Sequence, residues 1–118
     1  MNLSFKSHGT FGILRVDDSR IDASVAIAFK DRFRDLVSGS SGDVILDLAK
    51  VDFLDSSGLG ALVAARKLLG AGRVLELAGL TPAVDKVMTL TRMTTVFPIH
   101  PDAQAAVAAR NAQPSATS

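Results

Sequence analysis

The segment VDFLDSSGLGALVAARK, residues 51–67, holds the residue types that most plainly suggest chemistry. Between an apolar run and a stretch with helical spacing it places one acid, two serines and two glycines: Asp55, Ser56, Ser57, Gly58 and Gly60. The acid and the serines could accept hydrogen bonds from free N–H groups at a helix start. A serine could also attack a substrate or be modified by another protein. The segment therefore allows a structural turn, an enzyme or a switch.

Helix capping is the simplest interpretation of this spacing. Capping needs only one polar side chain, however, and the segment offers three. Glycine also weakens a helix by about 1 kcal/mol relative to alanine. The composition therefore favours an exposed turn that another molecule can approach closely.

Two enzymatic interpretations fit the segment less well. Gly58 and Gly60, with Glu76 near the end of the next predicted strand, form part of a dinucleotide-binding fingerprint. The third glycine position holds Val63, which would obstruct close packing, and Asp55 would repel a pyrophosphate. A serine hydrolase has a small residue where Asp55 stands, because its nucleophile lies on a strained turn. We therefore predict that the protein is not an enzyme.

Metal and cofactor chemistry has little support in the sequence. The chain has no cysteine, and its two histidines, His8 and His100, have no further ligands at suitable spacing. We expect no metal site and no cofactor.

Composition and charge narrow the possible partners. The chain has 118 residues, 47% hydrophobic and 21% charged, with a net charge of +1, and it lacks Tyr and Trp. The basic run KDRFR, residues 30–34, is interpreted as a solvated helix face, so we expect no direct binding of nucleic acid. The mean hydropathy is +0.28, but Arg66 and Lys67 interrupt the longest apolar stretch. Without a secretory pattern at its start, the chain is expected to be cytoplasmic and not inserted in a membrane.

Alternating strand and helix signals run along the chain. Strands are predicted at residues 11–16, paired with 3–5, and at 44–48, 74–79 and 95–99. One helix is predicted from Asp22 to the turn cluster at 38–43. A second helix is predicted after Ser57, and the glycines at 70–72 end it. Two later helices are predicted at 81–91, with Thr81 as its cap, and at 101–110.

This order predicts an α/β fold with a mostly parallel sheet and right-handed crossovers. The early strands would add an antiparallel edge, and Pro98 places the last strand at the other edge. Residues 1–110 are expected to form a single domain, followed by a flexible C-terminal tail at 111–118.

The stretch VILDLAKVDFLDSSGLGALVAARK, residues 44–67, closely resembles the signature of STAS-domain anti-sigma factor antagonists. The apolar strand, the D-S-S-G-L-G core and the following helix match in order, and the likeness continues through residues 72–100. Upstream, RID at 20–22 resembles the G-x-[IL]-D element of the family, with Ser19 in place of its glycine. The resemblance covers about residues 5–108.

The resemblance implies the STAS fold, a small mixed, mostly parallel sheet of four to five strands flanked by four to five helices. It implies that Ser56 is the phosphorylated serine, because Ser56 matches the serine directly after the acid. It also implies a partner-binding surface around this serine, with Ser57 serving the turn. That surface would comprise Asp22, Asp55, Ser57, Gly58, Leu59 and Gly60.

The implied function is partner switching in bacterial transcription. The unmodified protein would bind an anti-sigma factor that is also a serine kinase, and phosphorylation of Ser56 would release it. A serine phosphatase would then reset the switch. The alternative is a STAS subunit of a membrane lipid transporter, a fixed structural partner of an ATPase. Such subunits commonly depart from the family core at the serine positions, whereas this chain keeps both serines.

Overall fold

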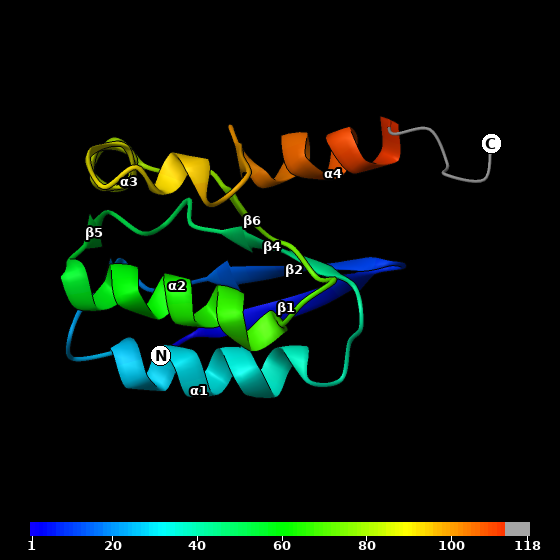
Figure 1. The fold of residues 1–118 in the computed structure, drawn as a ribbon, viewed down its shortest axis with the longest axis horizontal. Helices are drawn as coiled ribbons and strands as arrows, with labels where there is room; N and C mark the ends of the chain where they lie inside the picture. Colours follow the sequence, from blue (N-terminus) through cyan, green and yellow to red (C-terminus); the bar gives the residue numbers. More distant parts are fainter. Residues whose placement is uncertain (113–118) are drawn as a thin grey trace.

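A five-stranded sheet forms the centre of the computed structural model, which describes residues 1–112 (Figure 1). The strands in spatial order are β1 Leu3–His8, β2 Phe11–Val16, β4 Asp43–Asp47, β6 Leu75–Ala78 and β7 Ile99–His100. β1 is antiparallel to β2, and every other pairing is parallel. The mixed, mostly parallel sheet and its antiparallel edge are therefore confirmed.

Residues 1–112 hold four α-helices around this sheet: α1 Ala26–Val37, α2 Ser56–Leu69, α3 Pro82–Leu90 and α4 Ala103–Ala112. α1 and α2 lie side by side on one face, and α4 lies on the opposite face (Figure 1). α3 contacts the short strand β5 Phe53–Leu54 near the start of α2. No helix within the described part of the chain is long and apolar enough to cross a membrane.

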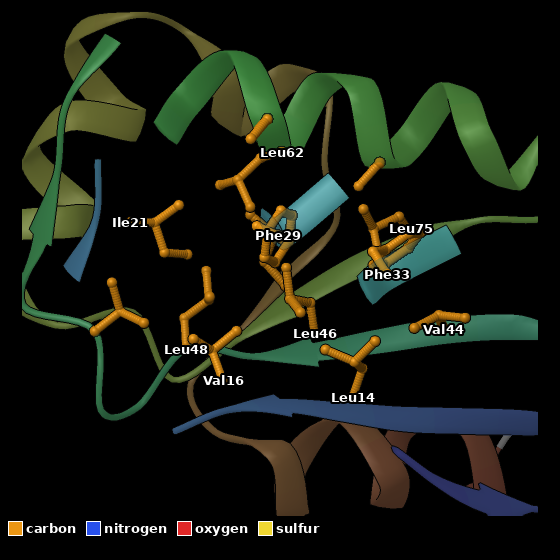
Figure 2. Close-up of a cluster of buried hydrophobic side chains, with 14 of the residues drawn as sticks. Leu14, Val16, Ile21, Phe29, Phe33, Val44, Leu46, Leu48, Leu62 and Leu75 are labelled. Carbon is orange, nitrogen blue, oxygen red and sulfur yellow. The ribbon is translucent and has the colours of Figure 1, made fainter. Parts of the chain in front are cut away.

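The main core fills the space between the sheet and the α1–α2 layer. Figure 2 shows Leu14 and Leu46 of the strands pointing toward Phe29 and Phe33 of α1, with Leu62 of α2 above them. These five side chains are fully buried. Burying an aliphatic or aromatic side chain of this size contributes about 1.5–3 kcal/mol. This layer is therefore the main source of stability.

β4 is buried on both faces, as its unbroken apolar sequence predicts. Val44 and Leu46 face the main core, whereas Ile45 packs under α4 with Phe11 and Ala106. The alternation of side chains along a strand sends neighbouring residues to opposite faces, so β4 contributes to the core on both sides of the sheet.

The first helix begins at Ala26, four residues later than predicted. The carboxylate of Asp22 accepts hydrogen bonds from the backbone N–H and the hydroxyl of Ser24, at 3.0 and 2.6 Å. Such local side-chain bonds compete with the helix and favour a turn. Residues 22–25 therefore form a turn before α1.

The strand predicted at 95–99 is wrong for most of its length. A 3₁₀ helix, η1 Met93–Thr95, follows Arg92, whose φ of 61° is left-handed. The chain then turns inward to bury Phe97, and β7 starts only after Pro98. Pro98 has no N–H, but its carbonyl accepts from the N–H of Leu77 at 2.8 Å. The predicted position at a sheet edge is nevertheless confirmed.

The ends of the last two helices also differ from expectation. Thr81 occupies the N-cap position of α3, but its hydroxyl donates to the carbonyl of Val51 at 2.6 Å instead of capping the helix. α4 continues to Ala112, two residues beyond the predicted domain end. The remainder of the predicted tail, 113–118, lies outside the described residues.

A charged cluster fastens α4 to the sheet. Arg110 of α4 donates to Asp43, at 2.7 Å, and to Glu76 of β6, a buried acid that also pairs with His100 at 2.7 Å. Burial disfavours the charge of Arg110, but the hydrogen bonds to Asp43 and Glu76 outweigh it and raise its pKa. The apolar contact of α4 is small, because alanines supply much of it. The ion pairs therefore matter for its docking.

We predict that Arg110→Ala lowers the free energy of unfolding by about 2–3 kcal/mol, because Glu76 then keeps its burial but loses the guanidinium paired with it. Urea unfolding followed by circular dichroism measures this loss. The exposed Arg66→Ala is the control and should change stability by less than about 0.5 kcal/mol. Equal stability of the two variants would contradict the role assigned to the ion pairs.

Candidate functional site

A second, two-stranded sheet marks the site and was not predicted from the sequence. β3 Arg20–Ile21 pairs in parallel with β5, with Arg20 opposite Phe53 and Ile21 opposite Leu54. Each strand is followed directly by an acid, Asp22 or Asp55, so parallel pairing brings the two acidic segments together. The apolar-Asp dipeptides at 21–22 and 54–55 were a weak sequence signal, because the same pattern also occurs at 16–17, 46–47, 51–52 and 84–85.

Asp55 links the two segments through its carboxylate. As the N-cap of α2, its Oδ1 accepts from the backbone N–H of Gly58 at 2.8 Å. Its Oδ2 accepts from the backbone N–H of Ala23, 32 positions earlier in the chain, at 3.1 Å. One side chain thus caps the helix and holds the turn that follows Asp22. The capping interpretation is confirmed for Asp55, so neither serine is needed as the cap.

Asp22 is held beside this cap in its charged form. The hydroxyl of Ser24 and, next, the side chain of Arg20 donate hydrogen bonds that lower the pKa of Asp22. Arg20 also lies over the ring of Phe53, 4.1 Å from its centroid. Sequence reasoning missed Arg20, Ser24 and Phe53, because the pairing of β3 with β5 brings them to this site.

Ser56 and Ser57 are the first two residues of α2, and both are exposed. Leu59, one turn into the helix, is only partly exposed and packs against the main core. The positive end of a helix dipole lies at this position and favours a negatively charged group. The site therefore presents hydroxyls that an external enzyme could reach, beside two carboxylates.

The two glycines of the segment have different surroundings. Gly58 is buried, and a Cβ placed on it would lie 1.9 Å from the carbonyl oxygen of Ile21. Only glycine lets α2 approach β3 so closely. Gly60 is exposed, and a Cβ there would meet nothing within 4 Å. Intramolecular packing therefore explains Gly58 but not Gly60.

Nucleophilic attack by a serine would need a nearby base, and metal binding would need a cluster of ligands. His100 is hydrogen-bonded to Glu76 on the face of the sheet that α4 covers, rather than to either serine. Within residues 1–112 no group of three or more His, Cys, Asp or Glu side chains could hold a metal ion.

We predict that Asp55→Ala lowers the free energy of unfolding by about 2 kcal/mol, because both backbone N–H groups lose their acceptor. Asp55→Asn keeps one acceptor oxygen and should lose about half as much. Chemical denaturation of the three proteins tests this order. An asparagine variant as stable as the wild type would show that the bridge to Ala23 contributes nothing.

The two glycines should respond in opposite directions to the same substitution. Gly58→Ala is expected to destabilise the protein by about 2–3 kcal/mol, because backbone must move away from the new methyl group. Gly60→Ala should stabilise it by up to about 1 kcal/mol, because alanine favours the helix and the space is open. Thermal and urea unfolding of the pair measure the difference. A destabilising Gly60→Ala would refute the distinction.

Comparison with protein families gives one match over most of the chain. The family model of the STAS domain matches residues 2–106. This range includes both acidic segments, the two serines and the whole of the central sheet.

Solved structures with similar folds agree with that match. An anti-sigma factor antagonist from Mycobacterium paratuberculosis is 26% identical, with a TM-score of 0.80 and 92% of each chain covered. The phosphorylated form of the Bacillus cell fate determinant SpoIIAA is 16% identical, with a TM-score of 0.63, covering 90% of this chain and 96% of that one. A sulfate transporter family protein from Wolinella succinogenes is 17% identical, with a TM-score of 0.72 and coverages of 86% and 85%. The last two show likeness of fold alone.

Proposed function

The chain belongs to the STAS-domain family, and from this premise we propose that it is an anti-sigma factor antagonist controlled by phosphorylation of Ser56. The unmodified protein binds an anti-sigma factor that is also a serine kinase, and a serine phosphatase reverses the modification. The observation that carries the proposal is the exposure of Ser56. This residue is the first of α2 and directly follows Asp55, which caps the helix.

The position of Ser56 suits a modification that leaves the fold intact. A phosphate adds about −1.5 to −2 charges at neutral pH. At the first residue of α2 the helix dipole stabilises part of this charge. The phosphate therefore need not unfold the helix that carries it. Among the structural neighbours, SpoIIAA has been solved in a phosphorylated form with the same fold.

The carboxylates of Asp55 and Asp22 lie near Ser56 and add to the negative charge of a phosphate placed there. Asp55 cannot turn away from it without giving up its bonds to Gly58 and Ala23. Asp22, with its lowered pKa, keeps a second negative charge at the adjoining turn. Arg20 pairs with Asp22 at 3.1 Å, so the two acids and this one cation leave a net charge of about −1 at the site before modification, and a phosphate on Ser56 adds to it. A partner that docks on this surface when it is unmodified is repelled after phosphorylation.

Gly60 supports close approach of a partner here. It lies on the exposed side of α2, one turn beyond Ser56, in a place where a side chain would fit without any contact. A glycine in an exposed helix lowers stability by about 1 kcal/mol relative to alanine. This loss of stability is explained if a partner packs directly against the backbone of Gly60, where a side chain would keep it away. Gly58, which is buried, contributes by holding the helix in place.

We predict that Ser56→Ala binds the kinase-type anti-sigma factor constitutively and that Ser56→Asp binds it at least 100-fold more weakly, a difference of about 3 kcal/mol. Isothermal titration calorimetry with the purified partner measures both affinities. Ser57→Ala is the matched control and should remain a substrate of the kinase. Equal affinities for the two Ser56 variants would remove the basis of the switch, and loss of labelling in Ser57→Ala would reassign the modified serine.

The transporter alternative has a weaker basis. This alternative is a STAS subunit of a membrane lipid transporter, whereas the transporter neighbour from Wolinella succinogenes is a sulfate transporter family protein whose 17% identity concerns the fold only. Intact mass and peptide sequencing of the protein from its native host separate the two functions. Phosphate on Ser56 in part of the population would favour the switch. An unmodified protein bound to a membrane ATPase under every growth condition would favour the transporter subunit.

A further inference from the structure

A groove runs between α1 and α2 on the outer surface of the helix layer. It has a volume of about 380 Å³ and is lined by Ile27 of α1 and by Ala64 and Leu68 of α2. Ile27 is 70% exposed and Leu68 is 40% exposed, although both are large aliphatic residues. The rest of the described chain does not cover these side chains. The groove therefore offers apolar surface to another molecule.

The rim of the groove is positively charged. Lys30, Arg34 and Lys67 line it, and Asp31 is the one acid among its lining residues. Asp31 is already paired with Arg34, at 2.9 Å. Lys30 and Lys67 make no ion pair within residues 1–112, so two ammonium groups flank the apolar centre without a counter-charge.

The groove is continuous with the surface around Ser56. Gly60, Ala64 and Leu68 follow one another at intervals of four residues, which places them on one stripe of α2. From Ser56 to Leu68 this stripe runs about 18 Å along the helix and winds about 120° around its axis, toward α1 at the Leu68 end. A partner that rests on Gly60 can therefore reach the groove along this stripe.

We propose that this groove is a second contact for the kinase-type partner that docks at Ser56. It receives an apolar side chain from a partner segment whose neighbouring carboxylates pair with Lys30 and Lys67. The inference rests on the proposed function, and it adds the chemistry of the partner: an apolar anchor flanked by acids.

Charge and shape favour this occupant over two others. A second copy of the chain, facing the first across a two-fold axis, would bring Lys30 and Lys67 toward the same basic rim. A membrane surface would attract the ammonium groups, but a concave groove suits a protruding side chain better than a lipid layer. A protein segment with an apolar side chain between acids fits both the positive charge of the rim and the concave shape of the groove.

The test uses the full chain and the purified kinase-type anti-sigma factors of the source organism, titrated one at a time by calorimetry. Ile27→Ser is expected to weaken the binding partner's affinity about tenfold, because the partner's apolar side chain loses an apolar residue of the groove that receives it. Leu90→Ser is the matched control, because Leu90 is 74% exposed on α3, outside the groove. This control should bind as the wild type does.

The charged rim is tested in the same way. Lys30→Glu should weaken binding about tenfold by repelling the partner's carboxylates, and the effect should shrink at high salt. Arg32→Glu, an equal change of charge on the same helix but outside the groove, is the control. Thermal unfolding of all four variants should match the wild type, because the substituted side chains are exposed or half-exposed.

The possible failures are distinguishable. Wild-type affinity in Ile27→Ser and Lys30→Glu, with binding still lost in Ser56→Asp, would overturn the groove contact and keep the proposed function. Absence of wild-type binding to every kinase, or equal affinity of Ser56→Ala and Ser56→Asp, would overturn the proposed function itself. A dimer seen by light scattering and abolished by Ile27→Ser would assign the groove to a second copy of the chain. Binding to phosphatidylglycerol vesicles that Lys30→Glu abolishes, with partner affinity unchanged, would assign it to a membrane surface.

Discussion

The carboxylate of Asp55 is the interaction on which the site geometry depends. Its two oxygens accept from Gly58 in its own helix and from Ala23 in a distant segment. The first bond sets where α2 starts, and the second fixes the turn that carries Asp22. Ser56 therefore has a defined place relative to both acids before any partner arrives. Such preorganisation lowers the entropy lost on binding and makes a local change of charge effective.

Close packing behind Asp55 keeps this arrangement rigid. Gly58 lets the backbone of α2 lie against Ile21, and Ile21 and Leu54 bury their side chains beneath the small β3–β5 sheet. Gly60, two residues further along, relieves no contact within the molecule. The same residue type thus serves internal packing at one position and leaves open surface at the other. A protein commonly gives up some stability at the place where it functions.

On the opposite face of the sheet, ion pairs contribute more to the packing than they do in the main core. There α4 contributes small side chains, and the ion pairs of Arg110 with Asp43 and Glu76 supplement a limited apolar contact. β4 contributes side chains to the core on both faces, Val44 and Leu46 on one and Ile45 on the other. The serine site, however, is built from α2, β3 and β5, on the side away from this cluster.

The sequence alone determined the order of the four helices and of the strands of the main sheet, the parallel pairing, and the helix start that carries the two serines, because these follow from local periodicity, caps and turn residues. It placed Asp55, Ser56 and the two glycines at a helix start correctly. It mistook residues 22–25 for helix and 95–98 for strand, because side-chain bonds of Asp22 and burial of Phe97 override local preference. Only the tertiary structure decided that Asp55 bonds Ala23, that Gly58 is packed while Gly60 is open, and that Arg20 reaches Phe53. Each of these joins residues far apart or depends on surrounding space, which no local pattern encodes.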